Sequence, residues 1–174
     1  MSVSAERDAR TVPGFWAAPF DSEVIEVRPE WIDPNNHMNL AYYTMAFDLA
    51  TDLIFDVFDC SYAYKDRAGC GTFAAESHNM YEAEMLLGEQ ARMVTWVLGV
   101  DAKRVHLAHE MYRLDDGRRA ATQELMYLHV DLRIRKVAPW PDAVRARIQA
   151  AYDAHVGHER PAWAGRRIAM PVPK

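Results

Sequence analysis

The residues best suited to chemistry lie in one polar stretch, Trp31-Ile32-Asp33-Pro34-Asn35-Asn36-His37-Met38-Asn39. It contains a carboxylate, an imidazole and three carboxamides: Asp33, His37, Asn35, Asn36 and Asn39. Carboxylates and imidazoles transfer protons near neutral pH, and a carboxylate can also act as a nucleophile. The stretch therefore predicts acid–base or nucleophilic chemistry. The alternative is that its polar side chains only satisfy the backbone of a turn.

The element that must position these groups is a helix predicted over Leu40–Phe58. Apolar residues recur there at three- and four-residue spacing over about five turns. The acidic residues Asp48, Asp52 and Asp56 fall on one narrow line. A helix that is apolar over most of its circumference belongs to the core. Its N-terminus offers free backbone N–H groups and the positive end of the helix dipole, which suit a developing oxyanion.

Length, charge and cysteine content limit the class of protein. The 174 residues are expected to form one domain, 1–174, and the net charge of -5 argues against nucleic-acid binding. No apolar run is long enough to span a membrane, and Met1–Arg10 lacks the apolar segment of a signal peptide. Cys60 and Cys70 are expected to be reduced thiols. These features together predict a cytoplasmic protein without a membrane partner.

The remaining chain has mostly the period-two pattern of strands. One strand, Ser22–Arg28, precedes the helix, and a loop over 59–71 follows it. Gln90–Asp101 is apolar on both faces, which is typical of a central strand. Asp115-Asp116-Gly117 predicts a hairpin turn. The other predicted elements are strands at Thr72–Met85 (with an interruption near Glu82), Arg104–Leu114 and Arg119–Arg133, and a helix at Asp142–His155.

This order, a strand, a long buried helix and four strands in an antiparallel meander, predicts an α+β hotdog fold. In a single hotdog domain, an antiparallel sheet of about five strands wraps around one long central helix. The core is expected over 22–142 and the C-terminal helix and tail over 142–174.

Several segments resemble a known family. The stretch Val27–Tyr43 resembles the hotdog-fold acyl-CoA thioesterases of the 4-hydroxybenzoyl-CoA thioesterase type. Later segments are similar to the branch that contains betainyl-CoA thioesterases and the thioesterase portion fused to carnitine dehydrogenases. These segments are Asp101–His106, Ala121–Glu124 and His129–Asp131 followed by Pro139. The resemblance implies hydrolysis of a short acyl-CoA, with betainyl-CoA the best guess, and no cofactor or metal. It also implies a homodimer or homotetramer with the site at a subunit interface.

The resemblance assigns roles within the polar stretch. Asp33 would be the catalytic carboxylate, either as a general base on water or as a nucleophile through an anhydride. Backbone amides near Asn39, Leu40 and Ala41 would polarise the thioester carbonyl. His37 would orient the carboxylate or the water, or protonate the departing thiolate. His37 departs from the best-known members of the family, but Asn35, His37 and Asn39 resemble the Asn-x-His-x-Asn pattern of plant acyl-carrier-protein thioesterases.

Further residues are expected to contact the substrate: Asn35, Leu40, Tyr43, Glu76 and His78. Glu76 and His78 share one face of a predicted strand, where the alternative is an ordinary surface pair. Four aromatic residues would cage a trimethylammonium group or else belong to the core: Trp16, Trp31, Tyr42 and Tyr43. Charge alone nominates Lys103, Arg104, Arg133 and Arg135 for the coenzyme A phosphates.

Two other functions stay open. Hotdog enoyl-CoA hydratases have Asp-x-Asn-Pro-x-His, with the histidine five residues after the aspartate. Here His37 follows Asp33 by four residues, and no proline follows Asn35. A non-catalytic module that binds acyl thioesters is the second alternative, and Asp33 counts against it. The histidines His106, His109 and His129 have no spacing typical of a metal site.

Overall fold

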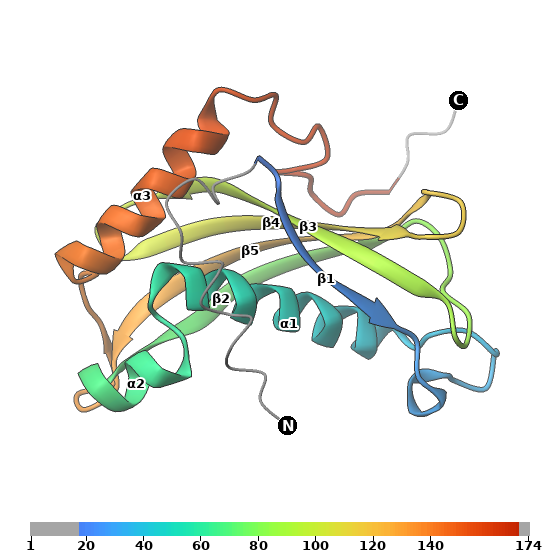
Figure 1. The fold of residues 1–174 in the computed structure, drawn as a ribbon, viewed down its shortest axis with the longest axis horizontal. Coiled ribbons are helices and arrows are strands. Elements are labelled where there is room, and N and C mark those ends of the chain that lie inside the picture. Colours follow the sequence, from blue (N-terminus) through green and yellow to red (C-terminus); the bar gives the residue numbers. More distant parts are fainter. Residues whose placement is uncertain (1–17, 171–174) are drawn as a thin grey trace.

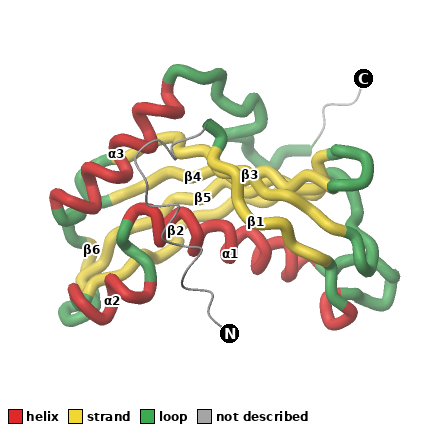
Figure 2. Tube along the Cα trace, viewed as in Figure 1, coloured by secondary structure: helices red, strands yellow, loops and turns green. Residues whose placement is uncertain are grey.

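The computed structural model describes residues 18–170, in which one antiparallel sheet curves around a long helix (Figures 1 and 2). The strands are β1 Phe20–Glu26, β2 Cys70–Tyr81, β3 Gln90–Val100, β4 Arg104–Arg113, β5 Arg119–Asp131 and the short β6 Lys136–Val137. The helices are α1 Leu40–Phe58, α2 Tyr62–Ala68 and α3 Asp142–Val156, with a 3-10 turn, η2, at Pro29–Trp31. The predicted α+β hotdog architecture is confirmed.

The order of the strands corrects one expectation. They lie in the order β1-β3-β4-β5-β2, all neighbours are antiparallel, and β6 pairs with β5. The β3, β4 and β5 hairpins form a meander with β3 inside the sheet, as expected. However, β2 pairs with β5, with Thr72 opposite His129, and not with its successor β3. Within residues 18–170, β2 therefore has no neighbour on its outer edge.

Helix α1 begins and ends as predicted and lies along the concave side of the sheet (Figure 1). Its apolar side chains are buried, with Phe47, Ala50 and Ile54 at most 1% exposed. The Asn39 side chain caps its N-terminus by accepting the Ala41 N–H at 3.0 Å. Asp59, in a left-handed conformation with φ 60°, ends it. Because α1 is packed in the core and Asn39 caps its first turn, the polar turn that precedes α1 is held against the core.

A row of polar side chains crosses the sheet beneath α1. Its members are direct cross-strand neighbours: Thr95, His109, Gln123 and Asn79. His109 is 0% exposed and contacts the hydroxyls of Thr95 at 2.8 Å and Thr51 at 3.0 Å. Because Thr51 donates its proton to Phe47 O, it accepts from His109 Nε2–H, and Nδ1 accepts from Thr95. The imidazole is thus satisfied in its neutral form, and burial lowers the pKa of His109 to about 3.

Two local predictions differ from the structure. The predicted loop over 59–71 contains α2, whose single buried residue, Tyr64, contacts His129 Nε2 at 2.8 Å. One buried residue in seven gives no readable periodicity, so the sequence did not reveal this helix. Strand β2 ends at Tyr81 and not at Met85, because the N–H groups of Glu82 and Ala83 both turn to Ala120 O.

Helix α3 and the segment after it cover other parts of the sheet. Its residue His155 accepts the Val97 N–H at 2.9 Å, on the part of β3 that β1 does not reach. The following segment, 157–170, crosses to the outer face, the face away from α1. There Trp163 Nε1 donates to Glu110 at 2.9 Å, and Trp96 and Arg119 donate to the same carboxylate. Glu110 therefore ties this irregular segment to the sheet.

The remaining expectations concern termini, cysteines and membrane spans. Trp16 lies outside the described residues, and Phe20, the first residue of β1, is buried. Cys60 and Cys70 are free thiols, as expected. None of the described helices is long and apolar enough to span a membrane.

Candidate active site

The polar stretch forms a closed turn in front of α1. Asp33 N–H donates to His37 O at 3.0 Å, and Asn36 N–H donates to Asp33 O at 2.9 Å. Asn36 has φ 64°, in the left-handed region that asparagine adopts more readily than most residues. Met38 N–H then donates to Met85 O at 2.8 Å, which joins the turn to the segment after β2. The turn is therefore held mainly by backbone groups.

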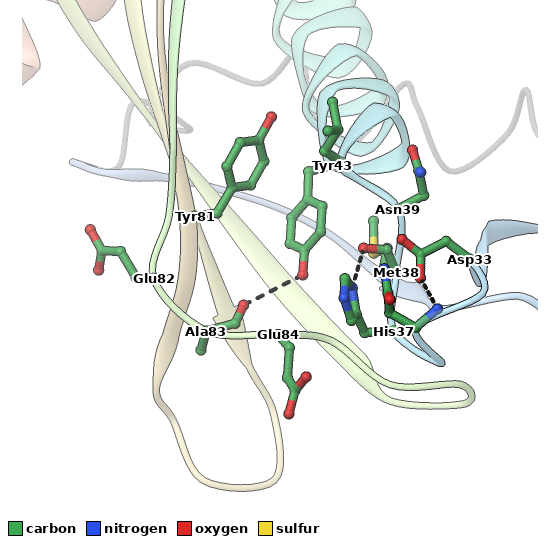
Figure 3. Close-up of a pocket in the computed structure, with 11 residues that line it drawn as sticks. Asp33, His37, Met38, Asn39, Tyr43, Tyr81, Glu82, Ala83 and Glu84 are labelled. Atoms are coloured by element: carbon green, nitrogen blue, oxygen red, sulfur yellow. Dashed lines mark hydrogen bonds between the residues drawn. The ribbon is translucent and has the colours of Figure 1, made fainter. Parts of the chain in front are cut away.

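Asp33 and His37 face one cavity from this turn (Figure 3). Asp33 Oδ1 accepts the Asn35 N–H at 2.7 Å, and no described residue donates to Oδ2. His37 Nδ1 lies 3.3 Å from Met38 O. When Nδ1 carries the proton and donates to that carbonyl, Nε2 is left as the free ring nitrogen. A carboxylate with one oxygen anchored and the other open fits a general base or a nucleophile.

The first turn of α1 adds a backbone donor. Ala41 N–H is taken by Asn39 Oδ1, and Tyr42 N–H donates to Asn39 O at 3.0 Å. In the part of the chain that the structure describes, Leu40 N–H has no acceptor. This amide lies at the positive end of the α1 dipole. It is therefore placed to donate to a carbonyl oxygen that gains negative charge.

The cavity in front of these groups measures about 480 Å³. It lies between the polar turn, the start of α1 and the segment that follows β2 (Figure 3). Its lining contains six residues expected from the sequence: Asp33, Asn35, His37, Asn39, Leu40 and Tyr43. Met38 and a second segment complete it: Tyr81, Glu82, Ala83 and Glu84.

Tyr43 fixes the wall opposite the turn. Its hydroxyl accepts the Met85 N–H at 3.0 Å and lies 3.4 Å from Ala83 O, and its ring packs edge-on against Tyr81 at 5.3 Å. Burial raises the pKa of Tyr43, so the phenol stays neutral at physiological pH. With both backbone contacts made, Tyr43 shapes the cavity and holds the segment after β2 in place.

Glu76 and His78 are not part of this cavity. The neighbouring Asn79 reaches Thr44 of α1 at 2.9 Å, and successive side chains of a strand alternate between faces. His78 and Glu76 therefore share the outer face of β2, where His78 lies opposite Glu124. The two residues do share a face, as expected, but on the side of the sheet away from α1.

Segment 82–84 is the part of the cavity that sequence reasoning missed. Glu82 is held by Arg119 through two hydrogen bonds of 2.9 Å. The only sequence signal for this segment was the interruption of the strand pattern near Glu82. It marks the point where the chain leaves the sheet and crosses in front of Tyr43.

Other candidates from the sequence have structural partners elsewhere. Trp31 and Tyr42 stack on each other at 5.6 Å, and among the described members of the proposed aromatic cage only Tyr43 lines the cavity. Arg104 and Arg133 pair with Asp101 and Asp131, each at 2.6 Å. His106 pairs with Glu124 on the outer face. Among residues 18–170, no group of three His, Cys, Asp or Glu side chains could hold a metal ion.

An antiparallel sheet wrapped around one long helix is the hotdog fold, and here it holds a carboxylate and an open amide at the start of that helix. The model of the thioesterase-like superfamily matches residues 27–148, and the chain belongs to this superfamily. It is a thioester hydrolase.

Individual relatives agree with this assignment. A betainyl-CoA thioesterase of Pseudomonas aeruginosa is 34% identical over 145 residues, which are 83% of this chain and 91% of the relative. An L-carnitine dehydrogenase/betainyl-CoA thioesterase of Ruegeria pomeroyi is 36% identical over 82% of this chain, and the match spans 29% of that longer protein. Among solved structures, a hypothetical protein of Staphylococcus aureus in complex with CoA superposes with a TM-score of 0.82. It is 25% identical, and the match covers 89% of this chain and 98% of that chain.

Proposed function

We propose that the protein hydrolyses a short acyl-CoA, betainyl-CoA in the first place, to the free acid and coenzyme A, with Asp33 as the catalytic carboxylate. One observation carries this proposal: the open Oδ2 of Asp33 and the open N–H of Leu40 lie at the same cavity. Thioester hydrolysis needs both a base or nucleophile and an oxyanion donor. The substrate is proposed from the names of the relatives.

Two routes use these groups in the same places. Asp33 Oδ2 either takes a proton from water as that water attacks the thioester carbon, or attacks the carbon itself and forms an anhydride that water then cleaves. Leu40 N–H donates to the carbonyl oxygen in both routes. His37 Nε2 lies free to hold the attacking water, or, when protonated, to give a proton to the departing coenzyme A thiolate.

The proposal includes a homodimer formed through β2, or a homotetramer of two such dimers, in the cytoplasm. The outer edge of β2 is unpaired in residues 18–170, and side chains 73–77 are exposed in its middle. A long open edge of this kind is a template for a further strand. Antiparallel pairing of two copies about Ala75 would place Asn79–Tyr81, beside the Asp33 cavity, opposite Gly69–Gly71 of the partner subunit. Two free thiols are consistent with a reducing compartment.

Thiol release from a panel of acyl-CoA esters tests the proposal. The panel contains betainyl, acetyl, propionyl, octanoyl and 4-hydroxybenzoyl thioesters. The Asp33→Asn variant keeps an oxygen that accepts the Asn35 N–H but loses the base, so kcat should fall by about 100-fold or more. Asp66→Asn, which changes an exposed carboxylate on α2, serves as the matched control and should be as active as wild type.

A single turnover in ¹⁸O-labelled water tests the anhydride route. Label in the Asp33 side chain indicates an anhydride that water cleaves at the Asp33 carbonyl carbon, whereas label only in the released acid indicates that water attacks the acyl carbon. An Asp33→Asn variant as active as wild type would show that another group performs the reaction. The absence of hydrolysis across the panel would refute the proposed activity.

A further inference from the structure

A second cavity lies near the other end of α1. It measures about 530 Å³ and is bounded by α1, by α2, by the start of β2 and by Tyr127 of β5. Asp48 and Asp52, on the acidic line of α1, belong to its lining, and so do Phe55, Tyr62 and Tyr127. It shares no lining residue with the Asp33 cavity.

The walls of this second cavity are aromatic. Tyr127 is 5% exposed and packs edge-on against Phe55, with ring centroids 4.9 Å apart. Tyr62 on α2 adds a third ring, which is 71% exposed. Aromatic faces attract quaternary ammonium groups through the negative potential above the ring.

The two carboxylates place these rings in a negative field. Burial is the main cause that raises the pKa of Tyr127 to about 12; contact with Thr51 opposes this rise, and the charges of Asp48 and Asp52 contribute to it. The charge of Asp52 is the main cause that raises the pKa of Tyr62, followed by burial and by Asp48. A field that opposes a phenolate at both rings favours a cation between them.

Two cations, Lys65 and Arg135, also line this cavity. Both side chains are exposed, and so is Asp48, so water and salt screen these three charges, whereas Asp52 is half-buried. The charges that perturb the buried phenol of Tyr127 are those of Asp48 and Asp52. The part of the cavity next to Tyr127 therefore favours a cation, while its exposed rim has mixed charge.

Within one chain this cavity is too far from Asp33 to share a small acyl group with it. Along α1, Asp48 lies about 14 Å and Asp52 about 20 Å beyond Asn39. In betainyl-CoA one methylene separates the ammonium nitrogen from the carbonyl carbon, a distance of about 2.5 Å. Pairing of two β2 strands about Ala75 removes this obstacle. This pairing places the start of β2 of one copy beside the end of β2 of the other copy. The start of β2 bounds the second cavity, and the end of β2 bounds the Asp33 cavity.

We propose that the cavity of Asp48, Asp52, Phe55, Tyr62 and Tyr127 binds the trimethylammonium group of an acyl-CoA whose thioester lies at Asp33 of the partner subunit. This inference rests on the proposed hydrolysis at Asp33 and on the β2 dimer. It adds the groups that select a cationic acyl chain over a neutral one of the same shape.

Comparison of betainyl-CoA with 3,3-dimethylbutanoyl-CoA tests the proposal. The second ester replaces the ammonium nitrogen with carbon, so shape is kept and charge is removed. Wild type should prefer betainyl-CoA in kcat/KM by about tenfold or more, and Asp48→Asn/Asp52→Asn should lose most of that preference. Hydrolysis of the neutral ester should change by less than about threefold. Asp56→Asn, one turn along the same acidic line but outside the cavity, should keep the wild-type ratio.

Several results would overturn the subsite while leaving the proposed hydrolysis intact. These are equal rates with both esters in wild type, an unchanged ratio in the double variant, or a preference for succinyl-CoA. If wild type hydrolyses no ester, the proposed function fails. In that case the binding of a small cation to the cavity tests the subsite separately. Saturation-transfer NMR should show tetramethylammonium bound to wild type and lost from the double variant, with tert-butanol as the neutral probe. Equal signals from both proteins would refute the subsite.

Discussion

The buried histidine beneath α1 should make the stability of the protein depend on pH. His109 is fully buried and neutral, with a pKa lowered by burial from 6.5 to about 3. Below pH 6.5 the unfolded chain therefore takes up a proton that the native protein does not bind. The contribution of neutral His109 to the free energy of unfolding is therefore fully present above pH 6.5. It is lost as the pH falls toward 3.

The size of this effect follows from the two pKa values. Each pH unit between them costs about 1.4 kcal/mol, so His109 alone should lower the free energy of unfolding by about 2 kcal/mol between pH 8 and pH 5. His109→Gln keeps a polar side chain but cannot titrate. Its free energy of unfolding should therefore fall less over this interval than that of wild type, by that amount.

Urea unfolding, followed by tryptophan fluorescence at pH 8 and pH 5, measures this difference. Each protein is studied at one fixed concentration, so that association contributes equally at both pH values. The exposed His158 provides the control, since His158→Gln should show the same pH dependence as wild type. If His109→Gln also loses as much stability as wild type between pH 8 and pH 5, His109 does not resist protonation, and the reasoning is wrong.

Two further substitutions test the supports of the site and of the C-terminal segment. Asn39→Ala removes the cap of α1 and should lower the free energy of unfolding by about 1 kcal/mol and reduce kcat, whereas Asn39→Ser should restore both. Unchanged melting and unchanged thiol release in the alanine variant would contradict this role. Glu110→Ala removes the acceptor of Trp163 and should expose segment 157–170 to trypsin, while Glu159→Ala, at an exposed position, should not. Equal cleavage rates for the two glutamate variants would show that Glu110 does not hold the segment.

The sequence predicted the local structure around the Asp33 cavity well. Asp33, His37, Asn39 and Tyr43 occupy one continuous stretch, and bonds between near neighbours set its geometry. The cap at Asn39 and the apolar period of Leu40–Phe58 fixed both ends of α1 correctly. Residues within a few positions of each other are placed by backbone geometry that sequence patterns describe directly.

The sequence could not place residues that depend on distant pairing. Glu76 and His78 were expected at the substrate, and the alternation of β2 did put them on one face. Which face meets α1 depends on the register of β2 against β5, and a shift of one residue exchanges the two faces. Segment 82–84 enters the cavity for a similar reason, since its turn is set by bonds to Ala120, on a strand far along the chain.

By itself, the sequence determined the polar turn, the buried helix behind it and the alternating strands, because each depends on contacts between near neighbours. The tertiary structure alone decided that β2 crosses to the far edge of the sheet, an edge that no other strand of residues 18–170 covers. It also decided that the acidic line of α1 meets Tyr62 and Tyr127 in a second cavity. These contacts join residues from α1, α2 and β5, and only the packing of the whole fold around α1 selects them.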